Sequence, residues 1–74
     1  MASEFYRLGY NAGAKVAHDC RREIRKAHKC DIPNMAGVKM QSVIHESKNA
    51  IYNSDSWKSG FFDGFLEKAE DLRG

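Results

Sequence analysis

The sequence has few cysteines, no long apolar run and only a small net charge. It contains one proline and two cysteines in 74 residues. It has no apolar run long enough for a signal peptide or for the roughly 20 residues that cross a membrane. Twelve basic residues against ten acidic ones leave a net charge of only +2, which is weak for a protein that holds nucleic acid by charge alone. We expect a cytoplasmic protein with no membrane partner.

The two cysteines are too far apart to form a disulfide if they lie on one helix. Cys20 and Cys30 are ten positions apart, or about 15 Å along a helix axis, whereas the Cα atoms of a disulfide lie within about 7 Å. We therefore expect free thiols. Zinc takes nitrogen and sulfur ligands, and the candidate ligands are His18, Cys20, His28, Cys30 and His45. His18, Cys20 and His28 do not share a helix face, and only His28 and Cys30 could be assembled, with a third ligand from elsewhere. The sequence therefore predicts no metal site.

Complete catalytic groupings are also missing. The glycines lie inside helical patterns and not in a phosphate-binding loop that follows a strand. Cysteine and histidine could act as nucleophile and base, but they would need an oriented third group and a pocket, which a small helical bundle seldom encloses. The sequence therefore predicts a protein that is not an enzyme and that holds no cofactor.

The composition is that of one small folded domain over residues 1–74. Hydrophobic residues make up 42% and charged residues 30% of the chain, which is too apolar for a disordered protein. A core of this size supplies only about 3–5 kcal/mol. Association, including formation of a homodimer, is therefore compatible with the size of the chain.

Apolar residues recur every three or four positions, which is typical of helices with one buried face. The pattern predicts three helices, over about residues 3–29, 34–52 and 55–72. Pro33 separates the first two because proline disfavours helical geometry in the residue before it. Ser54 is suited to cap the third helix at its start. We predict an all-α fold in which three helices pack together.

Glycines occur four residues apart in both the first and the third helix. Gly9 and Gly13 form one pair, and Gly60 and Gly64 form the other. Each glycine inside a helix costs about 1 kcal/mol relative to alanine, so a compensating contact is expected. Ridges of small residues let two helices approach closely, which predicts a close crossing of the first and third helices. The alternative is that one ridge admits the backbone of a partner. The large side chains beside these ridges are expected to cover the contact: Phe5, Leu8, Phe61 and Phe65, with Trp57 in the same row as the last two.

The clearest charge asymmetry lies between Lys15 and Lys29, a stretch that contains six basic residues and only two acidic ones. The predicted contacts to a partner are Arg21, Arg22, Arg25, Lys26 and Lys29. This stretch is either a docking face for an acidic protein or for RNA phosphates, or a solvated helix face that complements the helix dipole. No aromatic residue alternates with these basic residues to stack on bases.

Tyr6, Tyr10 and Phe62 lie beside the main apolar stripes. If they are exposed, they mark a surface for a partner or for a dimer, because aromatic residues are typical interface anchors. The alternative is that they cover the edges of the core.

Two motifs resemble a known family. The chain has GYNAG near its start and W-x-x-G-F near its end, and this pair is similar to the ribosome modulation factors and related short phage and plasmid proteins. The matching positions are Gly9, Tyr10, Ala12, Gly13, Trp57, Gly60 and Phe61. The resemblance implies paired helices and binding to the ribosome or to RNA. The chain has CDIP where that family has a Cys-Pro-Tyr element.

These patterns together predict a small non-enzymatic binding protein that docks on a larger protein partner. Its size and lack of catalytic groups are typical of regulators or inhibitors from phages and mobile elements. One alternative is a ribosome- or RNA-binding factor that uses residues 21–29. Another is a structural module that associates with itself.

Overall fold

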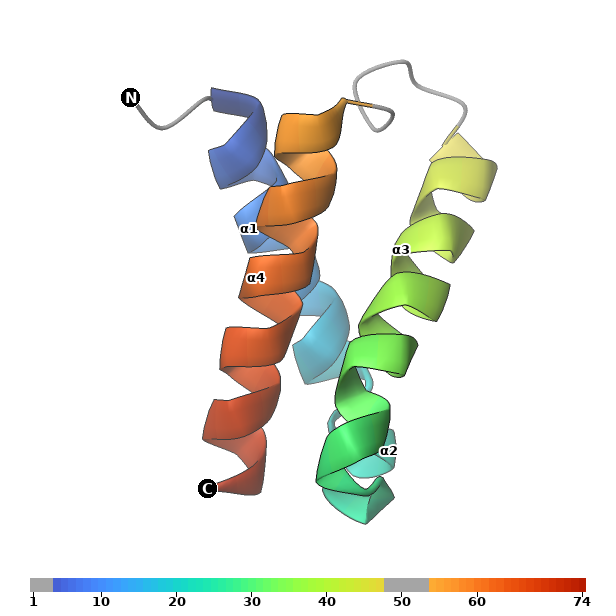
Figure 1. Ribbon diagram of the computed structural model, residues 1–74, viewed down its shortest axis with the longest axis vertical. Helices are drawn as coiled ribbons and strands as arrows, with labels where there is room; N and C mark the ends of the chain where they lie inside the picture. Colours follow the sequence, from blue (N-terminus) through green and yellow to red (C-terminus); the bar gives the residue numbers. More distant parts are fainter. Residues whose placement is uncertain (1–3, 48–53) are drawn as a thin grey trace.

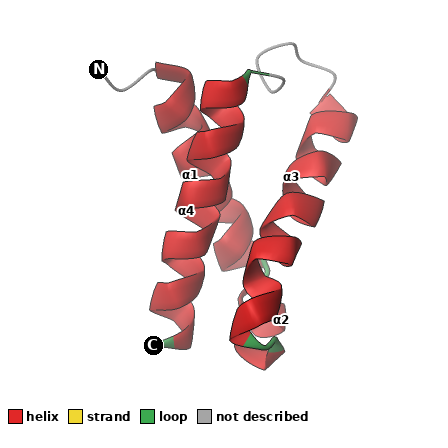
Figure 2. Ribbon diagram, viewed as in Figure 1, coloured by secondary structure: helices red, strands yellow, loops and turns green. Residues whose placement is uncertain are grey.

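The computed structural model describes residues 4–47 and 54–74, and within these ranges it is helical apart from short connections (Figure 2). The predicted all-α class is confirmed. In these ranges, four α-helices and one 3-10 helix follow one another: α1 (Glu4–Asp19), α2 (Arg21–Lys26), η1 (Lys29–Asp31), α3 (Ile32–Ser47) and α4 (Asp55–Arg73). None of these helices is long and apolar enough to span a membrane.

The prediction of one continuous helix over residues 3–29 was wrong. The first helix ends at Asp19, the chain turns at Cys20, and the short helix α2 ends where Ala27 adopts an extended backbone. The turn is tight, because the Cys20 N–H donates to the carbonyls of both Val16 and Ala17. The apolar spacing continues through Cys20 and Ile24, so the pattern in the sequence does not reveal the break.

The other two helices begin close to the predicted positions. The second predicted helix starts two residues early, at Ile32, and the end of its predicted range, 48–52, lies outside the described residues. Pro33 occupies the first turn of α3, where the backbone N–H needs no partner within the helix. The third predicted helix, 55–72, corresponds to α4, and the Ser54 hydroxyl accepts a hydrogen bond from the Trp57 N–H at 3.1 Å.

The helices α1 and α4 lie side by side along most of their lengths (Figure 1), and theirs is the most extensive contact between helices in the described part of the chain. The glycine pairs face this contact and are buried. A Cβ atom built on Gly9 would lie 2.1 Å from the Trp57 carbonyl oxygen, and one built on Gly60 would lie 2.1 Å from that of Tyr6. Neither position has room for a side chain.

The core is built around a row of aromatic rings on α4. Trp57, Phe61 and Phe65 are at most 1% exposed. Their ring centroids are 5.2 Å apart for the first pair and 6.2 Å for the second. Ile24 and Ile32 bring the second and third α-helices to this core. α3 contacts α4 less extensively than α1 does, so the tight pair of α1 and α4 is the central unit of the fold.

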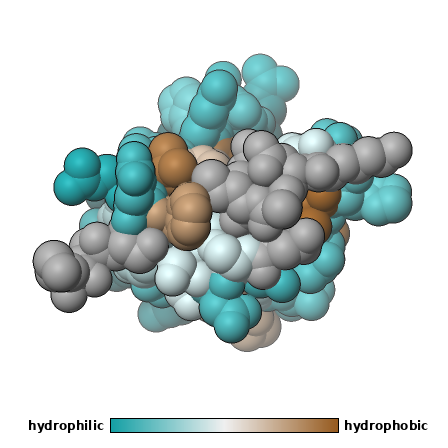
Figure 3. All heavy atoms as spheres, turned by 90° about the horizontal axis from the view of Figure 1, so that it is seen from above, coloured by the Kyte–Doolittle hydropathy of each residue, from teal (hydrophilic) through white to brown (hydrophobic). Residues whose placement is uncertain are grey.

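The two ends of the molecule differ in surface character. The end where α1 begins carries apolar surface among hydrophilic side chains (Figure 3). Phe5 and Leu8, in the first turns of α1, were expected to cover the glycine contact, but they are 43% and 46% exposed and lie outside the core. The short helix α2 lies at the opposite end of the long axis (Figure 1), which measures 33 Å. The exposed apolar side chains of Phe5 and Leu8 are thus separated from α2 by most of the length of the molecule.

Candidate functional site

The five basic residues predicted as contacts lie together in sequence on α2 and η1, and all are exposed. They are Arg21, Arg22, Arg25, Lys26 and Lys29, and we call them the cationic surface. At about 100° per residue, the four on α2 span an arc of about 140°. Ile24, outside this arc, is fully buried against the core. The short helix therefore turns one apolar side chain inward and its positive charges outward.

The only acidic residue within α2 is Glu23, and its charge is compensated by a residue of α3. The Lys39 ammonium lies 3.7 Å from the Glu23 carboxylate. Both side chains are accessible to solvent, so the pair adds less than about 1 kcal/mol to stability. On the surface, the positive charge of Lys39 offsets the negative charge of Glu23.

Arg73, in the last turn of α4, ties α2 to the rest of the molecule. Its guanidinium donates to the Ile24 carbonyl oxygen at 3.1 Å and also to the carbonyl oxygen of Ala27. The Ile24 carbonyl also accepts from the Ala27 N–H at 3.3 Å, and Ala27 is the residue that follows the end of α2. A cation at that end also complements the helix dipole. Arg73 thus holds in place the helix that carries most of the cationic surface.

Replacing Arg73 with methionine is expected to loosen α2 while leaving α1 and α4 paired. The substitution keeps most of the apolar stem but removes both hydrogen bonds, at a cost of about 1 kcal/mol. Amide hydrogen exchange over residues 21–27 should become faster, as followed by NMR. The control is Arg22→Met on α2 itself, which should leave exchange in this segment unchanged. Equal exchange in both variants would contradict the role given to Arg73.

The predicted aromatic contacts are all half-buried. The Tyr6 hydroxyl donates to the Asp63 carboxylate at 2.7 Å, and this hydrogen bond is the main cause that raises the pKa of Tyr6. The interaction of Tyr10 with the Glu67 carboxylate raises the pKa of Tyr10 to about 12. Phe62 packs against the core. The two tyrosines therefore join α1 to α4, and a role in binding a partner stays a prediction for all three.

Stability is expected to fall at alkaline pH as these tyrosines ionise. A raised pKa means that folding favours the neutral phenol, so the contribution is complete below pH 10 and is lost as the pH rises through about 12. Absorbance of the phenolate band should show Tyr10 titrating near pH 12, and Tyr10→Phe should remove that step. A Tyr10 that titrates near pH 10 would contradict the pairing with Glu67.

The predicted thiols and histidines are not gathered into a site in the part of the chain that the structure describes. Cys20 is half-buried, Cys30 is exposed, and neither forms a disulfide. His18, His28 and His45 are exposed. Across residues 4–47 and 54–74, no three His, Cys, Asp or Glu side chains lie close enough to hold a metal ion.

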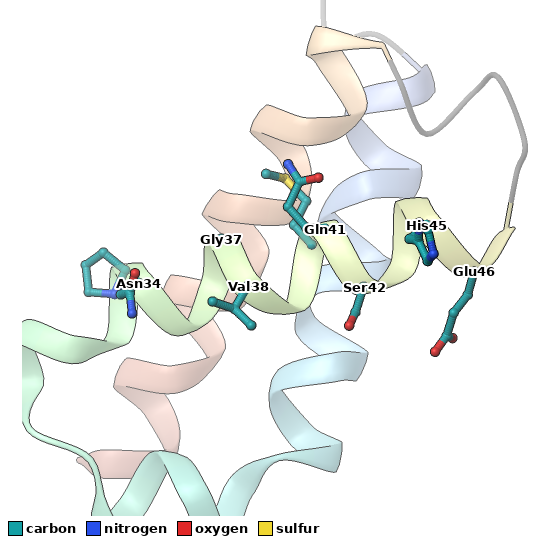
Figure 4. Close-up of a pocket in the computed structure, with 9 residues that line it drawn as sticks. Asn34, Gly37, Val38, Gln41, Ser42, His45 and Glu46 are labelled. Carbon is teal, nitrogen blue, oxygen red and sulfur yellow. The ribbon is translucent and has the colours of Figure 1, made fainter.

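A shallow hollow of about 730 Å³ lies along α3 (Figure 4). Val38, Ser42 and Glu46 project from one side of the helix there. Val38 is 58% exposed, and a Cβ atom added at Gly37 would meet no atom within 4 Å. The labelled lining side chains are mostly small or uncharged, so this hollow offers less for recognition than the cationic surface does.

Four residues of these contacts were not identified from the sequence: Lys39, Asp63, Glu67 and Arg73. The pairing of the tyrosines with the carboxylates could have been predicted from their spacing. Tyr6 and Tyr10 are four residues apart, as are Asp63 and Glu67, and the glycines on the same helices have the same spacing. The contact between Arg73 and α2 gave none, since it depends on where the chain turns at Cys20.

No protein family, curated protein or solved structure matches this chain.

Proposed function

We propose that this protein is a small non-enzymatic regulator or inhibitor that docks its cationic surface onto an acidic face of a larger protein. The observation that carries the proposal is the exposure of all five basic residues at one end of the molecule. The compensation of Glu23 by Lys39 and the anchoring of α2 by Ile24 and Arg73 support it. Complementary charge of this kind steers association and fixes the orientation of a partner.

The proposal includes the arrangement of the long helices. α1, α3 and α4 would form a three-helix frame in which α1 and α4 cross closely through ridges of glycine. Such a frame would hold α2 in a fixed orientation, and this lowers the entropy lost when a partner binds.

A protein partner is preferred over RNA because the sequence has no Phe, Tyr or Trp from residue 11 to residue 51. Sequence-tolerant binding of single strands commonly uses aromatic rings on which bases stack. RNA or ribosome binding is the second candidate, favoured by the same exposed basic residues and by the resemblance to the ribosome modulation factors. A phosphate-binding surface would lose affinity steeply as salt increases.

The experiment is recovery of co-purifying partners from a bacterial host by tagged protein, at low and high salt and with RNase. The test variant reverses three charges of the cationic surface: Arg21→Glu, Arg22→Glu and Arg25→Glu. The control makes the same change in net charge outside the basic stretch of residues 15–29: Arg7→Glu, Lys58→Glu and Lys68→Glu. We expect the wild type and the control to retain one partner protein after RNase treatment. The amount of that partner recovered with the test variant should be at least tenfold lower.

Three results would overturn the proposal. Equal recovery by both variants would mean that the cationic surface is not the docking face. Ribosomal RNA or ribosomal proteins that are released by RNase would establish the RNA-binding alternative. A defined oligomer by light scattering with no foreign partner would establish the self-associating module.

A further inference from the structure

A groove of about 430 Å³ lies between the end of α4 and the start of α3. These two segments are neighbours at the same end of the molecule as α2 (Figure 1). The walls of the groove are apolar and are formed by Ile32, Pro33, Leu66 and Ala69. Ile32 and Ala69 are buried, Leu66 is half-buried and Pro33 is exposed, so the groove has a closed floor and an open rim. Its volume is at the small end of the range of about 300–1,000 Å³ for ligand sites.

The charge at the rim of the groove connects it to the cationic surface. Lys29, a member of that surface, lines the groove, and so does Arg73. The hydrogen bonds of Arg73 to α2 use part of its guanidinium but leave its positive charge. Among the described residues that line the groove, Glu70 alone is acidic. Lys29, on η1, therefore joins the apolar walls of the groove to the cationic surface.

We propose that this groove accepts one bulky apolar side chain from an acidic segment of the partner protein, while the carboxylates of that segment lie on the cationic surface. This inference rests on the proposed function and specifies the chemistry of the partner. Recognition would combine an apolar anchor that is buried in the groove with flanking negative charges that select its orientation. RNA carries phosphates but no such aliphatic or phenyl anchor, so the combination distinguishes an acidic protein segment from a nucleic acid.

The test uses two short synthetic peptides of aspartate and glutamate, one with a central phenylalanine and one with a central serine. Each is titrated into the full-length protein labelled with ¹⁵N. We expect the phenylalanine peptide to bind about tenfold more tightly or better, because it buries a large apolar side chain. It should shift the amide signals of Ile32, Leu66 and Ala69, whereas the serine peptide should shift mainly those of α2 and η1.

Two variants link this preference to the groove. Leu66→Gln replaces an apolar wall and is expected to abolish the preference for phenylalanine. The control is Leu72→Gln on the same helix, where Leu72 is also half-buried but does not line the groove. If Leu66→Gln does not fold, as judged by circular dichroism, Pro33→Glu serves instead. This variant places a negative charge at the exposed rim of the groove, at a helix start that favours acidic residues. It should lower the affinity for the phenylalanine peptide at least tenfold.

The outcomes separate this inference from the proposed function. Equal binding of both peptides to the wild type would overturn the groove but keep the cationic docking surface. A preference for phenylalanine that survives Leu66→Gln, or survives Pro33→Glu where that variant is used, would also overturn the groove. Failure of both peptides to bind would overturn both proposals. Binding of polyuridylate RNA in the same assay, with neither peptide bound, would then favour the RNA-binding alternative.

Discussion

Replacing Gly13 with alanine is expected to unfold most of the protein. A Cβ atom at this position would lie 2.1 Å from the Phe61 carbonyl oxygen, whereas ordinary contacts begin near 3.4 Å. The obstacle is backbone, so no change of rotamer can relieve it, and α1 and α4 would have to separate by more than an ångström. We expect a loss of about 3 kcal/mol or more. This is comparable to the whole stability of about 3–5 kcal/mol that a domain of this size has.

The measurement is thermal unfolding followed by circular dichroism, with Gly37→Ala as the matched control. Gly37 also lies inside a helix, but an added Cβ atom there meets nothing within 4 Å. Alanine at Gly37 should therefore stabilise the protein by about 0.5–1 kcal/mol, which corresponds to a rise in Tm of about 2–8 °C. The same substitution thus has opposite signs at two glycines. An unchanged Tm for Gly13→Ala would refute the close contact between α1 and α4.

Replacing Phe61 with alanine is expected to cost about 3–5 kcal/mol. Phe61 is 0% exposed, and its ring lies between those of Trp57 and Phe65. Its removal leaves a cavity at the centre of the aromatic row. The glycines of α1 cannot fill this cavity because they have no side chains. The rings of Trp57 and Phe65 also each lose their contact with the Phe61 ring.

The neighbouring Phe62 provides the control for Phe61. Phe62→Ala removes the same atoms from the next position of the same helix, but Phe62 is only half-buried. We expect its loss to cost about 1–2 kcal/mol. The midpoints of urea unfolding measure both changes. Equal effects of the two substitutions would contradict the central position of Phe61 in the core.

The parts of the fold that depend on local signals could be predicted from the sequence. The start of α4 was predicted because Ser54 is a suitable cap and precedes the most regular apolar pattern in the chain. The break after Asp19 could not be predicted in this way. Apolar spacing reports which residues face the core, and Ile24 faces the core from α2 as it would from a continuous helix.

The candidate site could be predicted only in its charges. The basic residues of α2 form a visible cluster in the sequence, and their exposure follows from the burial of Ile24. The role of Arg73 could not be predicted because its partners are backbone carbonyls, which no pattern of side chains identifies. The groove likewise depends on the distance between the end of α4 and the start of α3. That distance is set by tertiary packing.

The pairing of α1 with α4 has a consequence for how the protein reaches its fold. Tyr6 and Asp63 are 57 positions apart in the chain, and Arg73 is 49 positions from Ile24. A long loop must close before such contacts stabilise anything, and this slows folding relative to helical proteins whose contacts are local. During synthesis, α1 leaves the ribosome first. The glycine face of α1 can pack against α4 only after α4 has been synthesised.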